Sequence, residues 1–134
     1  MIVKKIIDIT IKPVLIIGGI GTALAGANAF LPQWAVENIQ EIGWIQDYTI
    51  FVQHWGIMVC LMGVFMVAAA FVKSWRTPII LYGLLEKAFM VFLVFTNAEF
   101  DYSNGFYVPA GMDSFLTVYS ILYFIALRTE VKEN

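Results

Sequence analysis

Apolar residues dominate four stretches of the chain, and short polar or aromatic stretches separate them. Each apolar stretch can cross a bilayer as a helix, because about 20 residues at ~1.5 Å rise match a hydrocarbon core of roughly 30 Å. We predict membrane spans at about residues 13–31, 50–72, 78–97 and 110–127. The predicted fold class is all-α: an integral membrane four-helix bundle that forms one domain over residues 1–134.

Small residues recur at helical spacing within the first two predicted spans. Gly18 and Gly26 belong to a stripe in the first span, and Gly56 and Gly63 belong to a stripe in the second. Such stripes let two membrane helices approach closely. Cys60 lies on the second stripe, where we interpret it as a small packing residue. We therefore expect these glycines to line close helix contacts.

A short basic head, residues 1–12, precedes the first span, and Pro13 suits the first position of a helix. Lys4, Lys5, the apolar run and the Ala-Asn-Ala sequence at 27–29 also resemble the three regions of a secretory signal peptide. We expect the segment to be retained as a helix.

The two longer connections have the composition of a membrane–water interface. Residues 32–49 predict an interfacial helix after the first span, with two tryptophans at the boundary, where an indole keeps its ring apolar and its N–H wet. Residues 98–109 predict an aromatic flap, and the dipeptide Asn104-Gly105 is typical of a hairpin turn.

Basic residues fall on one side of the predicted bundle. Seven of the eight Lys and Arg residues lie in the head, in the turn at 73–76 or in the tail at 128–134, whereas residues 32–49 and 98–109 contain none. The positive-inside tendency therefore predicts that both termini face the cytoplasm. The expected location is the bacterial plasma (inner) membrane.

The composition argues against several classes of function. Only 13% of the 134 residues are charged, against about 25% in soluble domains. One cysteine forms no intrachain disulfide, and one cysteine with one histidine gives no transition-metal motif, so no metal site is predicted. No basic patch or Gly-rich loop points to nucleic acids or nucleotides. The cofactors, if the protein uses any, are unknown from the sequence.

Two charged residues, Glu86 and Lys87, lie near the middle of the third span. An isolated charge at that depth costs several kcal/mol, roughly 2.5 to 17 depending on the method, so such residues normally face a protein interior or a wet cavity. One helical face is polar at both ends with a carboxylate in its centre: Tyr82, Glu86, Met90, Leu93 and Asn97. We expect this face to point inward. Tyr82, Glu86, Lys87 and Asn97 are therefore candidates for ligand binding or proton titration.

Each candidate also has a structural interpretation. Glu86 can bind a proton or anchor a ligand, or it can form a structural hydrogen bond or an ion pair with Lys87. The stem of Lys87 can instead extend its ammonium toward water. His54 and Asp113 are two further candidates that can pair with each other. Alternatively, Asp113 lies in the first turn of the last helix, where a carboxylate meets the helix dipole, and His54 reaches interfacial water.

The layout of four helices in 134 residues is similar to that of small DoxX-like membrane proteins. The segments that carry the resemblance are the glycine-spaced second span, Gln53-His54-Trp55-Gly56, Arg76-Thr77-Pro78 and Glu86-Lys87. Some members of that family are membrane partners of respiratory or thiol oxidoreductases, so the resemblance implies an accessory role. The chain has no cysteine pair that would carry thiol chemistry.

Three classes of function remain open. The first is an accessory or binding protein, whose polar interior holds a lipophilic small molecule or which docks a larger membrane complex. The second is a small proton-coupled transporter, suggested by the intramembrane charges. The third is a membrane enzyme that acts on a lipophilic substrate by acid–base chemistry. Expected partners are the lipid bilayer, further copies of the chain or a larger membrane complex, and a lipophilic small molecule, but no nucleic acid.

Overall fold

A computed structural model describes residues 2–133 of the chain and the side chains of residues 2–129. Over this range the chain is helical, and it contains no strand. The α-helices are α1 (Ile2–Ala23), α2 (Gly26–Phe30), α3 (Pro32–Asn38), α4 (Thr49–Phe71), α5 (Arg76–Thr96) and α6 (Tyr107–Glu133). Three short 3-10 helices join them: η1 (Gln46–Tyr48), η2 (Lys73–Trp75) and η3 (Asp101–Phe106).

Four helical segments are long and apolar enough to cross a membrane: Ile2–Phe30, Gln46–Phe71, Lys73–Thr96 and Asp101–Thr129. Large apolar side chains are exposed along all four, including Ile17, Phe65, Phe89 and Val118. A continuous apolar exterior of this kind suits a lipid environment, because water would not solvate it. The predicted all-α bundle with four candidate spans is confirmed.

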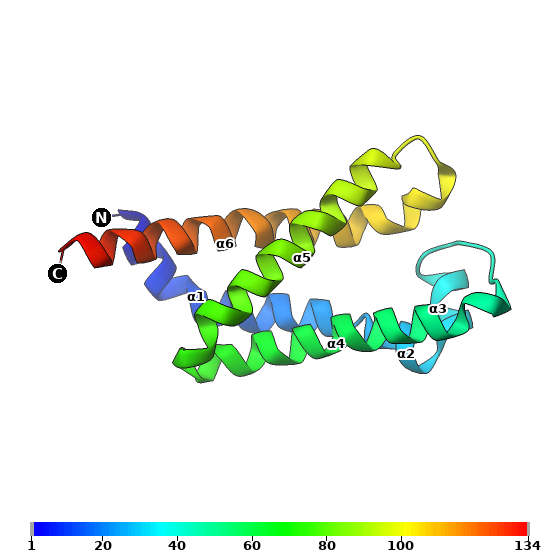
Figure 1. Cartoon of the computed structure of the whole chain (residues 1–134), viewed down its shortest axis with the longest axis horizontal. Helices are drawn as coiled ribbons and strands as arrows, with labels where there is room; N and C mark the ends of the chain where they lie inside the picture. Colours follow the sequence, from blue (N-terminus) through cyan, green and yellow to red (C-terminus); the bar gives the residue numbers. More distant parts are fainter. Residues whose placement is uncertain (1, 134) are drawn as a thin grey trace.

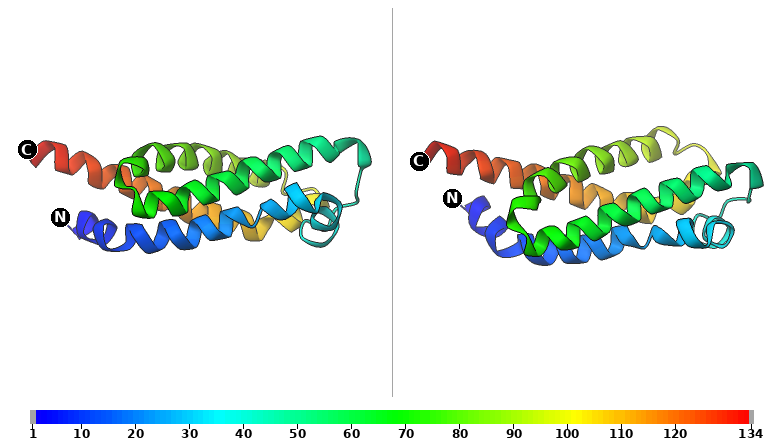
Figure 2. Two further views of the ribbon diagram at one scale, coloured as in Figure 1. Left: turned by 90° about the horizontal axis from the view of Figure 1, so that it is seen from below. Right: turned by 60° about the horizontal axis from the view of Figure 1, so that its bottom comes forward.

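The helices form two pairs that diverge from one end of the molecule. Both termini lie at one end, together with η2, and we call it the terminal end (Figure 1). The segment between α2 and α4 lies at the opposite end with η3, and we call it the loop end. Helices α1 and α4 run side by side (Figure 2), whereas the α5–α6 pair separates from them toward the loop end (Figure 1).

Glycines allow α1 and α2 to pack almost backbone to backbone on α4, as the small-residue stripes predict. A Cβ atom on Gly63 would collide with the backbone of Gly19 and Ala23, and one on Gly56 would collide with the backbone of Asn28 and Ala29. A Cβ on Gly26 would lie 3.0 Å from the Sγ of Cys60, so the predicted packing role of Cys60 is confirmed.

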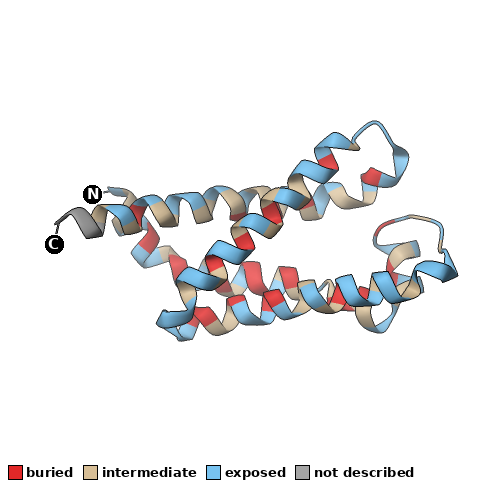
Figure 3. Ribbon diagram, viewed as in Figure 1, coloured by how far each residue is buried: buried red, intermediate tan, exposed pale blue. Residues whose placement is uncertain are grey.

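The buried core lies toward the terminal end. It is built from aliphatic, methionine and alanine side chains of four helices: Ile7, Ile11, Leu15, Met62, Met66, Ala69, Ala70, Ile80, Leu116 and Ala126. Figure 3 shows the buried residues concentrated where α1, α4 and α5 converge, while the outer faces are exposed. Arg76 closes the turn between α4 and α5, because its Nε and Nη2 donate to the carbonyls of Ala69 (3.0 Å) and Ala70 (2.9 Å).

Two side-chain contacts fix the register of the antiparallel pair α5 and α6. Near the terminal end, the hydroxyls of Thr77 and Tyr123 are 2.9 Å apart. Farther along, the Lys87 Nζ lies 2.8 Å from the Asp113 Oδ1. The residue numbers in each pair add to the same total, as in two helices that run antiparallel without a shift.

The structure differs from the sequence predictions in the segments outside the spans. The head is helical and continuous with the first span, so Pro13 lies inside α1 rather than at its start. The interfacial helix is shorter than predicted, because α3 ends at Asn38. The hairpin expected at Asn104-Gly105 is wrong, since η3 occupies that stretch.

A backbone contact joins the two connections at the loop end. A Cβ on Gly105 would collide with the backbone of Gln40, so only glycine permits this approach. Glu41, the residue after Gln40, has a φ of 56°, a left-handed conformation that is uncommon for a residue with a side chain. The contact holds η3 of the α5–α6 pair against the chain that follows α3.

Candidate functional site

A cleft opens at the loop end between the two helix pairs. It consists of two adjoining pockets, one of about 550 Å³ that we call the loop pocket and one of about 510 Å³ that we call the charged pocket. Residues that line both pockets connect them: Asn28, Gln40, Trp55, Met90 and Phe106. Each volume falls within the roughly 300–1,000 Å³ typical of small-molecule sites.

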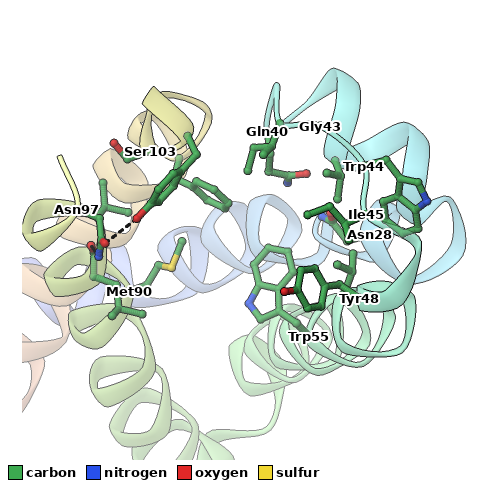
Figure 4. A pocket seen from close by; sticks show the side chains of 17 residues that line it. Asn28, Gln40, Gly43, Trp44, Ile45, Tyr48, Trp55, Met90, Asn97 and Ser103 are labelled. Atoms are coloured by element: carbon green, nitrogen blue, oxygen red, sulfur yellow. Dashed lines mark hydrogen bonds between the residues drawn. The ribbon is translucent and has the colours of Figure 1, made fainter. Parts of the chain in front are cut away.

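The loop pocket has mainly apolar and aromatic walls. Trp44, Tyr48 and Trp55 line it from the side of α4 and the segment before it, and Met90 lines it from α5. Figure 4 shows Trp55 and Tyr48 on one side of the pocket with Met90 and Asn97 on the other. Asn97 already has a partner, because its Oδ1 accepts a hydrogen bond of 2.8 Å from the Tyr102 hydroxyl.

The charged pocket contains three ionisable side chains in direct contact. The Lys87 Nζ donates to Asp113 Oδ1 at 2.8 Å and lies 3.5 Å from Glu86 Oε2. The Lys87 side chain is only 3% exposed, whereas the Glu86 side chain is 26% exposed. Lys87 and Asp113 therefore form a buried ion pair, and Glu86 sits at its edge toward the cleft.

Four buried oxygens with no hydrogen-bond partner surround the same pocket. They are Thr22 Oγ1, Asn28 Oδ1, Gln40 Oε1 and Glu86 Oε2, and all four residues line the charged pocket. Among the described side chains just one other buried oxygen, on Thr117, shares this condition. The amide and carboxylate oxygens can only accept, so the pocket presents acceptors that lack donors. Buried polar groups are normally satisfied, and such a concentration calls for an explanation.

The structure brings together three of the six residues that the sequence singled out. Glu86, Lys87 and Asp113 line the charged pocket, and Asn97 lines the loop pocket. Tyr82 and His54 are exposed and line neither pocket.

Three sequence interpretations of single residues are wrong. Lys87 does not extend toward water, because its ammonium is paired inside the bundle. His54 does not pair with Asp113, whose partner is Lys87. Asp113 also lies beyond the first turn of its helix, since α6 begins at Tyr107, so it does not occupy the position where the helix dipole is strongest.

The inward face of α5 is rotated from the predicted one. Its buried residues are Ile80, Gly83, Lys87 and Val94, whereas Tyr82 and Leu93 of the predicted face are 52% and 40% exposed. The prediction is wrong for Tyr82, whereas Glu86, Met90, Leu93 and Asn97 of the predicted face do line the cleft. Lys87 turns inward because Asp113 lies opposite it, a fact that depends on the register with α6.

Gln40, whose side chain is buried in the cleft, was not among the site residues predicted from the sequence. It follows α3 in a polar stretch, and its position in the cleft depends on the contact between its backbone and Gly105. Nothing in the local sequence indicates that contact. The sequence does single out Trp44, but as a residue of the membrane interface rather than of a pocket.

Within the described side chains, no group of three or more His, Cys, Asp or Glu residues is arranged to hold a metal ion. Comparison of the chain with models of protein families, with characterised proteins and with solved structures finds no match. The chemistry of the cleft therefore carries the functional argument.

Proposed function

We propose that the protein is an integral membrane binding protein that holds a lipophilic small molecule in the cleft. One observation carries this proposal: an apolar cavity continues from the aromatic residues of the loop end down to a buried charged group. A lipophilic molecule with a polar head matches that gradient, because its chain can occupy the loop pocket while its head reaches Glu86.

The proposal includes an orientation in the bacterial inner membrane. The basic residues cluster at the terminal end, and the connections at the loop end contain none. With both termini in the cytoplasm, the cleft would open toward the outer leaflet. Association with further copies of the chain or with a larger membrane complex, as the DoxX-like layout implies, stays a prediction. The transporter and enzyme alternatives would use the same carboxylates.

Native mass spectrometry from a mild detergent tests the binding function. The parent protein is expected to carry a bound lipophilic molecule, or to take up an added one, with a stoichiometry of one per chain. Val59 lines the charged pocket, so Val59→Trp should fill the cleft and abolish this adduct.

Val64→Trp is the matched control. Val64 lies on the same helix but is 50% exposed on the outer face, so its replacement should leave the adduct in place. Equal retention of the adduct by Val59→Trp and Val64→Trp would place the molecule outside the cleft. A parent chain that neither carries nor takes up such a molecule would contradict the proposal.

A further inference from the structure

We infer that the molecule held in the cleft is a lipophilic amine, with a positively charged head that donates hydrogen bonds next to Glu86. This inference rests on the proposed binding function and specifies the class of ligand. Its basis is the juxtaposition of excess negative charge and unpartnered acceptor oxygens in the charged pocket.

The charges that line the charged pocket do not balance. The ion pair of Lys87 and Asp113 neutralises itself at 2.8 Å, and Glu86 contributes a further carboxylate 3.5 Å from the same ammonium. Glu41 adds another carboxylate at the exposed rim. Three carboxylates and one ammonium thus line this pocket, and a partly buried carboxylate without full compensation is unfavourable in a low-dielectric site. A ligand cation supplies the missing charge.

The hydrogen-bonding capacity of the pocket independently points to the same head group. Asn28 and Gln40 are 2% and 6% exposed, and their unpartnered side-chain oxygens can only accept hydrogen bonds. The hydroxyl of Thr22, 3% exposed, is also unpartnered and can accept. An ammonium offers several donors at once, whereas a carboxylate or phosphate head would add acceptors to a site that already has too many.

The walls explain why the cation should be lipophilic. Val59 and Met112 line the charged pocket, and Trp44, Tyr48 and Trp55 line the adjoining loop pocket. Aromatic and aliphatic side chains of this kind bury a hydrocarbon chain favourably. A small hydrated cation such as Na⁺ has no apolar surface that could pack against these walls.

Two probes that differ only in the head group test the inference. Tetradecylamine and tetradecanol would be titrated into the full chain in nanodiscs of zwitterionic phosphatidylcholine, with empty nanodiscs as the reference for partitioning. Quenching or enhancement of tryptophan fluorescence can report occupancy, because Trp55 lines both pockets. The amine is expected to bind at least about tenfold more tightly than the alcohol, since charge-assisted hydrogen bonds are markedly stronger than neutral ones.

Variants locate the preference at the charged pocket. Glu86→Gln should reduce the preference for the amine to about twofold or less, because the uncompensated charge is gone. Glu99→Gln removes an exposed carboxylate that lines neither pocket, and it should retain the full preference. Thr22→Val preserves the charges but removes one acceptor, and it should weaken amine binding a few fold. This variant serves as a second test where Glu86→Gln fails to fold.

The outcomes separate the inference from the proposed function. Equal saturable binding of the amine and the alcohol would overturn the inference and leave the binding function standing. Absence of saturable binding by either probe would overturn both. A preference for the amine that survives both Glu86→Gln and Thr22→Val would show that the charged pocket does not recognise the head.

Discussion

At the scale of single residues, the Lys87–Asp113 pair is the central polar feature of the bundle. It joins α5 to α6 at 2.8 Å, and the Lys87 side chain is only 3% exposed. Glu86 is different, because it is the more exposed of the two carboxylates near Lys87 and its Oε2 makes no hydrogen bond in the described part of the chain. The structure thus distinguishes Asp113, which is hydrogen-bonded to Lys87, from Glu86, which lies 3.5 Å from the same ammonium and lines the cleft.

A stability cycle tests this division of roles. Lys87→Met should lower the free energy of unfolding by about 3–5 kcal/mol, because it leaves the buried Asp113 carboxylate unpaired. Asp113→Asn should cost less, because Glu86 remains 3.5 Å from the Lys87 ammonium. The double variant should lose much less than the sum of the two. Glu86→Gln should cost below about 1–2 kcal/mol, the usual range for a partly exposed polar contact. Denaturant unfolding in detergent measures all four values, and additive losses for Lys87 and Asp113 would refute the pairing.

The sequence could identify the charged residues but not their partners. Glu86 and Lys87 stand out because charges are rare in an apolar stretch, and this signal was sufficient to find the site. The choice of Asp113 over His54 as a partner follows from the register of α5 against α6. That register is set by contacts such as Thr77 with Tyr123, which no local pattern encodes.

At the scale of elements, close packing of α1 on α4 contrasts with the looser pairing toward α5. Gly19 and Gly63 bring the backbones of α1 and α4 together, and Gly56 brings α4 close to the backbone of α2 at Asn28. In a bilayer, association of helices depends on such van der Waals contact rather than on a hydrophobic driving force. The α1–α4 pair is therefore the more closely packed side of the cleft.

Two alanine substitutions of opposite effect test the packing. Gly63→Ala should destabilise the protein by about 1–3 kcal/mol, because the new methyl group meets backbone atoms that cannot move aside. Gly111→Ala, in α6, places its methyl group in open space, so it should leave the stability unchanged or raise it by up to about 1 kcal/mol. Thermal melting in detergent distinguishes the two, and equal melting temperatures would contradict the assignment of close contacts.

The spans and the glycine stripes could be predicted because both depend on local composition. The connections could not, since they are shaped by what they contact. The dipeptide Asn104-Gly105 favours a hairpin that requires a positive φ at glycine, yet no described glycine has one. Gly105 instead serves the close approach to Gln40, an interaction between segments far apart in sequence.

At the scale of the whole molecule, the two helix pairs converge toward the terminal end and diverge toward the loop end (Figure 1). The buried core lies where the helices converge, and the cleft lies at the loop end between the two pairs. The contact between Gln40 and Gly105 spans the loop end and limits the divergence. A chain of only 134 residues can therefore hold both a cavity and a buried core, because the two lie in different parts of the bundle.

Thiol labelling in intact cells tests the proposed orientation. Single cysteines at Glu37 and Asn104, both exposed at the loop end, should react with a membrane-impermeant reagent in a Cys60→Ala background. A cysteine at the exposed Ser74, in η2, should react only after the membrane is permeabilised. Labelling of Ser74→Cys in intact cells would reverse the topology.

Photo-crosslinking tests the central claim, that the cleft binds a lipophilic molecule, most directly. A long-chain amine with a diazirine in its chain would be irradiated with the full protein in nanodiscs, and the modified residues would be mapped by tandem mass spectrometry. The cleft predicts adducts on Trp55, Val59, Met90 and Phe106, and excess unlabelled tetradecylamine should suppress them. Adducts confined to lipid-facing residues such as Phe89 and Val118, or insensitive to the competitor, would contradict it.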